Sequence, residues 1–438
     1  MAISVPSLAA ALQTLLTPIA DRAAKESGFV RRARKITGAG FVRSLVLGWM
    51  ADPDATVEDL AASLGVAAQS LQERFNDRAV DCLRRVLIAA MGYLFEARAE
   101  TIPLLRRFTA VAIDDSTSVP LPAALAKEYP GCGGSDGDAG QAGVKILARI
   151  EAITGRLELS EPRPGKTSDH TLHASSSPLP PGSLRLADLG FFDLERMAAD
   201  TAAGVHWISR APARLRVRRG GEAGANLPEW LRRQGSDRID TIVTVGTETR
   251  LTCRLVAVRA PEEVVRRRLE QLEKKQRKKG RKVSAAQRML CGWTVMLTDL
   301  TDADRFTAEQ LWILYRVRWQ VELLFKRWKS GGGLGKSRGR LGPRVLCELL
   351  AKLLGALIKH WGTLLRGGPL CAVSAVRAAV RVKWWATRLA EAIGSGAPEA
   401  VVRVLERLKA DLDRLPKRPN RKRKTTRQTL FAPSFTLS

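Results

Sequence analysis

The chain has 438 residues, enough for roughly two to four domains, and 45% of its residues are hydrophobic, which excludes a disordered protein. Its formal net charge of +28 at pH 7 favours a polyanionic partner such as DNA, RNA or an anionic membrane. A membrane span is not expected, because the most apolar segment, 349–365, is interrupted by Lys352 and Lys359.

The cysteines and histidines do not predict a metal cluster. The six cysteines are scattered without a Cys-x-x-Cys pair, and the four histidines are dispersed. This pattern argues against a zinc site, and a disulfide framework is not expected in a chain of this size. We interpret the neighbouring His170 and His173 as loop residues.

The first predicted element is a helical N-terminal region, 1–105, that we expect to bind DNA. Within it, the segment 56–75 resembles a helix-turn-helix, with Thr56 as N-cap and Asp59 three residues later. Gly65 is expected to end the first of its two helices. The alternative is an ordinary pair of antiparallel helices in a bundle that does not touch DNA.

Strands and a helix alternate in the next hundred or so residues. The segment 108–115 is predicted to be a buried strand that ends in two acids, and 183–188 a shorter strand that ends in one acid. The other expected elements are a flexible glycine-rich loop at 130–143, a β-hairpin at 144–162, a loop at 162–182, a helix at 194–201 and a strand at 205–209. This order predicts an α/β fold.

The segment 210–290 interrupts this alternation. It holds strand-like stretches at 241–245 and 252–258 and a very basic helical run at 264–282. We interpret it as a β-rich insertion whose basic run contacts phosphate groups, the alternative being a solvated helix.

One predicted helix, 315–329, carries the most informative side chains. Four of them are spaced by 3, 4 and 7 positions: Tyr315, Arg318, Glu322 and Lys329. At about 3.6 residues per turn, this spacing places all four on one face of a continuous helix. A carboxylate binds a divalent metal and cations bind phosphate, so the stripe predicts half of a metal-dependent site for a phosphodiester. The alternative is a solvated face with ion pairs, although the aromatic and leucine residues of this helix predict burial.

The remainder of the chain is basic and helical. A glycine loop at 330–340 resembles a phosphate cradle but lacks the strand–turn–helix setting of an NTPase loop, so an NTPase is excluded. Helices are expected to continue to about residue 413. The tail 417–427 is predicted to be disordered and to bind nucleic acid non-specifically.

The four-residue pattern resembles the signature of bacterial insertion-sequence DDE transposases of the IS-four family, and all four residues and all three gaps match. The resemblance implies a ribonuclease-H-like α/β catalytic core, with acids at the ends of adjacent central strands and on one helix. The implied layout is a helical N-terminal DNA-binding region at 1–105, the catalytic core at 106–209 and 291–345, a β-rich basic insertion at 210–290, a C-terminal helical region at 346–415 and a basic tail at 416–438.

The same resemblance implies three catalytic acids that hold two Mg²⁺ ions, for which Mn²⁺ can substitute. Glu322 is one of them, and Asp115, with Thr117 after it, fits the family motif of strand, Asp, polar residue and Thr or Ser. Asp114 is a competitor, because only one of two successive strand residues can face the site. Such ions stabilise the attacking and leaving oxygens of a phosphoryl displacement.

Asp188 is the remaining implied acid, because a strand that ends in Asp followed by Gly-Phe is similar to the second motif of the family. Asp169 is a weaker rival in a loop. Asp193 lies beyond the strand and is expected to cap the next helix.

The resemblance also assigns side chains that contact DNA. Tyr315, Arg318 and Lys329 would hold phosphates of the DNA end by charge-assisted hydrogen bonds. Trp293, which opens a predicted strand, would stack on a base flipped out of the duplex, the alternative being a core residue. We expect Trp319 to pack in the interior.

The implied function is a cut-and-paste transposase that cleaves and transfers the ends of its own insertion sequence. Its partners would be the terminal inverted repeats and the target DNA, bound by a homodimer in the bacterial cytoplasm, at the nucleoid, without a membrane. One alternative is a catalytically inactive DNA-binding repressor derived from a transposase, which predicts a broken acid triad. Another is a structure-specific nuclease of the same fold, which does not need the Tyr-Arg-Glu-Lys stripe.

Overall fold

The computed structural model describes residues 1–32, 35–98, 102–132, 141–174, 176–277, 280–368, 370–417 and 424–431. These residues form a mixed α/β protein with helical regions before and after a sheet, which confirms the predicted fold class. The chain divides into two compact units: unit 1 comprises Met1–Glu100, Asp115–Leu172 and Gln320–Asn420, and unit 2 comprises Thr101–Asp114, His173–Trp319 and Arg421–Ser438. The finer domain limits expected from the sequence stay a prediction.

Unit 1 begins with a run of helices, as predicted. They are α1 (Val5–Thr14), the π-helix η1 (Leu15–Ile19), α2 (Ala20–Glu26), α3 (Gly38–Ala51), α4 (Val57–Ala62), α5 (Ala68–Gln72) and α6 (Asp77–Met91). Ser4 and Ser7 form a capping box at the start of α1. Pro18 lies in η1, where the wider turn suits a residue that has no N–H to donate.

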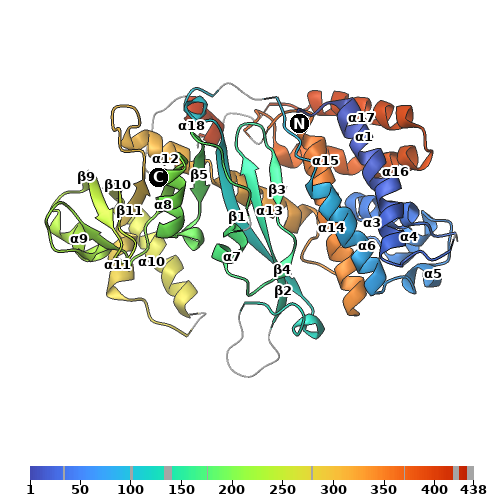
Figure 1. The fold of residues 1–438 in the computed structure, drawn as a ribbon, viewed down its shortest axis with the longest axis horizontal. Helices are drawn as coiled ribbons and strands as arrows, with labels where there is room; N and C mark the ends of the chain where they lie inside the picture. Colours follow the sequence, from blue (N-terminus) through green and yellow to red (C-terminus); the bar gives the residue numbers. More distant parts are fainter. Residues whose placement is uncertain are drawn as a thin grey trace. The chain divides into compact units, whose positions relative to one another are not determined.

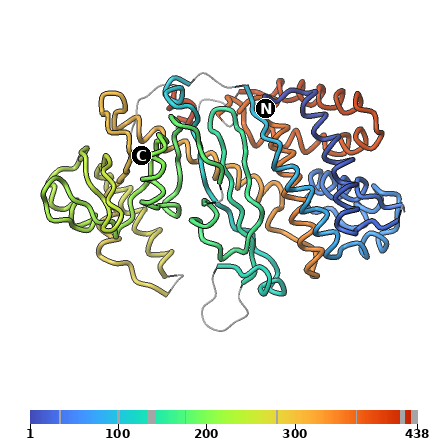
Figure 2. Tube along the Cα trace, in the orientation of Figure 1, coloured from blue at the N-terminus to red at the C-terminus, as the bar shows by residue number. Residues whose placement is uncertain are grey.

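The C-terminal helices of unit 1 pack on this N-terminal run. They are α14 (Gly342–Leu364), α15 (Ala375–Trp384), α16 (Ala386–Gly394) and α17 (Pro398–Asp413). The long helix α14 packs against α3 and α6, and in Figures 1 and 2 it runs as an orange helix beside the blue α6. Most of its side chains are buried in this helical core. Among the described helices, none has the length and apolar character that crossing a bilayer requires.

A buried ion pair on α14 holds the glycine loop that precedes it. Lys352 Nζ lies 2.7 Å from Glu348 Oε1 and also donates a bond of 2.9 Å to the carbonyl of Lys336. Ser337 Oγ donates a 2.8 Å bond to the other oxygen of Glu348. The two charges are therefore satisfied by each other and by the loop backbone, as burial requires.

The predicted helix-turn-helix segment forms two short helices, α4 and α5. The Thr56–Asp59 capping box is present, and Gly65 has a left-handed backbone with φ +63° between the helices. Arg344, at the start of α14, hydrogen-bonds Gln72 of α5 and lies 5.3 Å from the ring centroid of Phe75. DNA binding by this segment stays a prediction.

The sheet has eleven strands in the order β3-β2-β1-β5-β6-β11-β10-β9-β7-β8, with β4 beside β2. The strands are β1 (Val111–Leu121), β2 (Ala142–Glu151), β3 (Leu157–Leu159), β4 (Arg163–Pro164), β5 (Leu184–Ala187), β6 (His206–Arg210), β7 (Arg216–Arg218), β8 (Ala225–Asn226), β9 (Arg238–Val245), β10 (Leu251–Arg259) and β11 (Trp293–Thr298). Strands β1, β5 and β6 are parallel, whereas β6, β11, β10 and β9 pair antiparallel.

Strand β1 is longer than the sequence predicts. The expectation that it ends at Asp115 is wrong, because Thr117 and Val119 continue the alternation of buried residues and extend the strand to Leu121. Both acids of the doublet therefore stand inside a strand. The shorter strand β5 ends at Ala187, immediately before Asp188, as predicted.

Other predicted elements are confirmed. Strands β2 and β3 form the expected hairpin, with Gly155 in the left-handed conformation at φ +75°. Helix α8 (Leu194–Ala202) is capped by Asp193, whose side chain accepts bonds from two backbone N–H groups. Residues 133–140 of the glycine-rich loop lie outside the described residues, as do 418–423 of the tail; beyond these, α18 (Thr426–Phe431) is helical.

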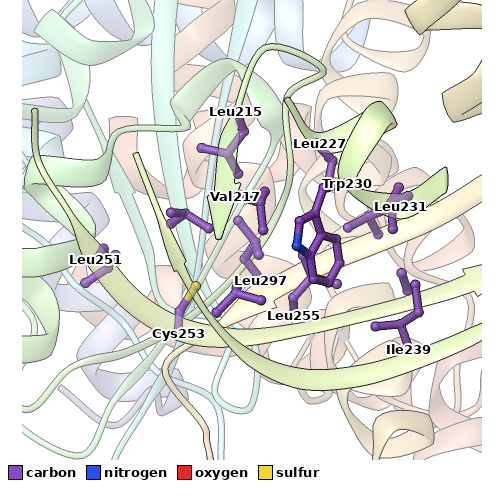
Figure 3. Close-up of a cluster of buried hydrophobic side chains, with 14 of the residues drawn as sticks. Leu215, Val217, Leu227, Trp230, Leu231, Ile239, Leu251, Cys253, Leu255 and Leu297 are labelled. Carbon is purple, nitrogen blue, oxygen red and sulfur yellow. The ribbon is translucent and has the colours of Figure 1, made fainter. Parts of the chain in front are cut away.

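The segment 210–290 contains the strands β7 to β10 and also α9 (Leu227–Arg233), α10 (Glu262–Arg277) and α11 (Ala285–Cys291), and its interpretation as a β-rich insertion stays a prediction. Figure 3 shows Trp230 and Leu231 of α9 packed with Leu255 of β10 in an apolar cluster. The basic helix α10 has no buried residue among those described, and Lys278 and Lys279 lie outside the described residues. Its phosphate contacts stay a prediction.

Candidate active site

Asp114 is the centre of a buried network of charged side chains in unit 2. It is fully buried, and its Oδ2 accepts a 2.6 Å hydrogen bond from Arg185 Nη1. Arg185 also binds Asp200, with Nε 2.7 Å from Oδ2 and Nη2 3.2 Å from Oδ1. His173 Nε2 lies 2.9 Å from the same oxygen of Asp114. A buried carboxylate needs such partners, so the network explains Asp114 without a catalytic role.

The sequence analysis missed this network. The interpretation of His170 and His173 as loop residues is wrong, because both lie on the short helix α7 (Asp169–Ala174). His173 is buried, and its ring centroid lies 5.4 Å from that of Phe191. The sequence signal that could have predicted this network was Arg185, since a cation between two leucines of a buried strand requires an acid nearby.

Asp115, the next residue of β1, has different surroundings in unit 1. It is partly exposed, and its Oδ1 accepts a 2.8 Å hydrogen bond from the backbone N–H of Ser116. Partial burial lowers the pKa of Lys329, and the negative charge of Asp115 raises that pKa. Two of the predicted site residues, Asp115 and Lys329, are thus electrostatic neighbours.

Asp169 also lies close to this part of β1. Its Oδ1 accepts a 2.6 Å hydrogen bond from Ser116 Oγ, and Lys145 Nζ lies 3.4 Å away. The expectation that it lies in a loop is wrong, since it is the first residue of α7. Its contacts with a hydroxyl and an ammonium group give it a structural role.

Asp188, Tyr315 and Arg318 come together in unit 2. Arg318 Nη2 lies 3.8 Å from Asp188 Oδ1, and its guanidinium carbon lies 5.8 Å from the Tyr315 ring centroid. The phenol of Tyr315 donates a 3.4 Å bond to the carbonyl of Ala187. Burial raises the pKa of Tyr315 to about 12, with Arg318 opposing and Asp188 adding to this shift, so the phenol stays protonated at neutral pH.

The predicted helix 315–329 is not continuous. Helix α12 (Ala308–Arg316) ends before a turn, α13 (Trp319–Lys326) follows, and the π-helix η5 (Arg327–Gly331) completes the segment. The backbone N–H groups of Val317 and Arg318 bond the carbonyls three residues earlier, which tightens the chain at the break. The expectation that one face of one helix carries all four signature residues is therefore wrong.

Glu322 lies on α13 in unit 1 and is partly buried. Its unit also contains Asp115, whereas Asp188 belongs to unit 2. Among the residues that the structure describes, no group of three or more His, Cys, Asp or Glu side chains is arranged to hold a metal ion. The donor chemistry nevertheless fits Mg²⁺, which prefers carboxylate oxygens and retains several of its waters.

The structure favours the alternative for Trp293, a core residue, and contradicts the expected burial of Trp319. Trp293 is only 3% exposed, packs in the same apolar cluster as Trp230, and has the guanidinium carbon of Arg259 4.8 Å from its ring centroid. Trp319, expected to pack inside, is 56% exposed. The arrangement gives no support to base stacking by Trp293, which would require this ring to leave the core.

The chain matches the family of the transposase DDE domain over residues 106–358, more than half of its length. It belongs to this family. The DDE transposases are polynucleotidyl transferases, and their domain confirms the predicted ribonuclease-H-like core. The predicted catalytic acids, together with Tyr315, Arg318, Lys329 and Trp293, lie inside the matched segment, whereas the predicted DNA-binding region 1–105 precedes it.

The chain is similar to known transposases along most of its length. It is 27% identical over 376 residues to the transposase for insertion sequence element IS231F of Bacillus thuringiensis subsp. israelensis, which covers 79% of this chain and 78% of the relative. It is 25% identical over 374 residues to the transposase for IS1151 of Clostridium perfringens, covering 77% and 76%. This DDE transposase is therefore one of the transposases of insertion sequence elements.

Proposed function

We propose that this DDE transposase moves its own insertion sequence by a cut-and-paste route, with Asp115, Asp188 and Glu322 as its catalytic acids. The observation that carries the proposal is the match to the DDE domain over 106–358, together with the complete set of signature residues within it. In this proposal the protein binds the terminal inverted repeats and the target DNA as a homodimer, at the nucleoid of a bacterial cytoplasm.

The choice of Asp115 over Asp114 is supported by their surroundings. Asp114 is saturated by Arg185 and His173 in the interior, whereas Asp115 is partly exposed beside Lys329. A metal ligand needs accessible oxygens, so the first acid of the proposed site is Asp115.

The three acids would hold two Mg²⁺ ions, and Mn²⁺ could replace them. When bound, the ions supply Lewis-acid stabilisation to the attacking and leaving oxygens of a phosphodiester. The protein side chains position the DNA end: Arg318 by its charge and fork of donors, and Tyr315 by a hydroxyl that stays protonated at neutral pH. Lys329 would add a cation beside Asp115.

The test is excision of a marker flanked by the ends of the element, in cells that produce the wild type or Glu322→Gln. The substitution removes a metal-binding charge at nearly constant shape, and we expect excision to fall by about 10²–10³-fold. Glu391→Gln, a change at an exposed residue of α16, is the matched control and should excise normally. Equal excision by Glu322→Gln would contradict the assignment of the third acid. Binding of the ends without any excision by the wild type would favour a repressor.

A further inference from the structure

An apolar groove lies in unit 1 among α13, η5, α14 and α15. Its volume is about 370 Å³, within the usual range of small-molecule sites. Its apolar walls include Leu323 of α13, Trp328 of η5, Ala356 of α14, and Val376 and Val380 of α15. Leu323, Val376 and Val380 are 42%, 59% and 39% exposed, so the groove opens to solvent.

The charged residues that line the groove are all cations: Lys326, Arg327, Lys359 and Lys383. No Asp or Glu is among its lining residues. Burial, reinforced by the positive charges of Lys383 and Arg327, lowers the pKa of Lys359 to about 8. An anion in the groove would stabilise the charged form of this ammonium group. The groove is thus complementary to a ligand that is apolar in its body and negatively charged at one end.

An unpaired nucleotide of DNA has both properties. Its phosphate is the anion, and its base presents an apolar face that stacking covers in an intact duplex. The walls α13 and η5 also carry Glu322 and Lys329, so DNA held by these residues would follow the same elements. A DDE transposase acts on DNA, which makes this ligand available to the groove.

A further stacking surface stands on α15 in line with the groove. Trp384 follows Val376 and Val380 at intervals of one helical turn and is 60% exposed. The guanidinium carbon of Arg381 lies 4.5 Å from the centroid of its indole ring. Indole rings with nearby arginines are typical partners of single-stranded nucleic acid.

We propose that this groove binds one unpaired nucleotide of the DNA, with the base against Leu323, Val376 and Val380 and the phosphate beside Lys359 and Lys383. The site goes beyond the cut-and-paste function and is separate from the acids that perform it. It requires only that the full-length protein binds DNA.

The test compares the affinity for a blunt duplex with that for the same duplex carrying a short single-stranded thymine overhang. Binding is measured by fluorescence anisotropy in EDTA, so that no strand is cut. We expect the wild type to prefer the overhang about tenfold, the low end of stacking one base. Val380→Glu, which places a carboxylate in the groove, and Lys359→Met should both abolish this preference. Lys359→Arg should retain it.

The matched control is Ile88→Glu, which adds the same charge at a 44% exposed position of α6 outside the groove and should keep the overhang preference. Circular dichroism shows whether each variant is folded.

The proposal is overturned if the wild type has no preference for the overhang, or if folded Val380→Glu and Lys359→Met keep that preference. It is also overturned if Val380→Glu changes only self-association in sedimentation, because the groove is then a contact between copies. If the wild type excises no marker but keeps its overhang preference, the cut-and-paste function is contradicted and the groove site still stands.

Discussion

Two successive aspartates of β1 have opposite environments. Asp114 is fully buried and bound by Arg185 and His173, whereas Asp115 is partly exposed and lies within electrostatic reach of Lys329. The comparison shows that residue type does not decide whether a carboxylate stabilises a fold or remains available for chemistry. Strand alternation and the partners on neighbouring elements make that decision.

A large effect on stability is expected at Asp114, the fully buried member of the doublet. Asp114→Ala removes one partner of the buried guanidinium of Arg185, and we expect the free energy of unfolding to fall by about 3 kcal/mol. Asp115→Ala should change it by less than about 1 kcal/mol, because its carboxylate is partly solvated. Urea unfolding of the two variants measures the difference.

Asp114→Asn is the control for shape, since the amide keeps one acceptor oxygen, loses the charge and replaces the other oxygen by an NH2 donor. Its stability should lie between those of the wild type and Asp114→Ala. If Asp114→Ala and Asp115→Ala lower the free energy of unfolding equally, Asp114 is not more strongly buried and paired than Asp115.

A second pair, Trp293 and Trp319, extends the comparison to aromatic residues. Trp293→Ala leaves a cavity in the apolar cluster of unit 2, and we expect a loss of about 3–5 kcal/mol. Trp319→Ala removes a ring that is mostly in solvent and should cost about 0.5 kcal/mol. Thermal unfolding compares them, and a greater loss at Trp319 would contradict the burial seen for both rings.

A pH-dependent effect is expected from His360, a buried side chain of α14. Its Nε2 lies 2.7 Å from the carbonyl of Gly155, and its Nδ1 has no hydrogen-bond partner among the described residues. Burial lowers its pKa from 6.5 to about 4; the hydrogen bond to Gly155 opposes the shift, and Arg327 adds to it. The unfolded chain therefore binds a proton more readily, so this contribution to stability is present above about pH 6.5 and is lost as the pH falls towards 4.

His360→Gln keeps a donor for the Gly155 carbonyl and cannot titrate. Below pH 6.5 we expect wild-type stability to fall more steeply than that of the variant, by up to about 1.4 kcal/mol per pH unit. Urea unfolding at pH 7 and at successively lower pH measures this difference. Parallel pH profiles of the two proteins would show that folding does not lower the pKa of His360.

Much of the fold could be predicted because local patterns determine it. The helical N-terminal run, the β2–β3 hairpin, the strand before Asp188 and the cap at Asp193 follow from periodicity, turn residues and capping chemistry. The signature of Tyr315, Arg318, Glu322 and Lys329 indicated a DDE transposase, and the match over 106–358 confirms that coarser assignment. The assignment of individual catalytic residues stays a prediction.

Two features of the structure could not be predicted from local sequence patterns. The break between α12 and α13 contains neither proline nor glycine, so no local signal predicts it. There Val317 and Gln320 are buried, whereas Trp319 between them is exposed. The network of Asp114 likewise joins residues up to 86 positions apart, from Asp114 to Asp200 through Arg185.

The sequence by itself therefore determined the family, the fold class and the candidate residues of this transposase, since spacing and composition are properties of the chain alone. The tertiary structure decided which aspartate of the doublet is buried, which tryptophan is exposed, and where cations surround an apolar groove. These depend on which side chains meet in space, and burial and charge pairing act between residues that local sequence rules do not connect.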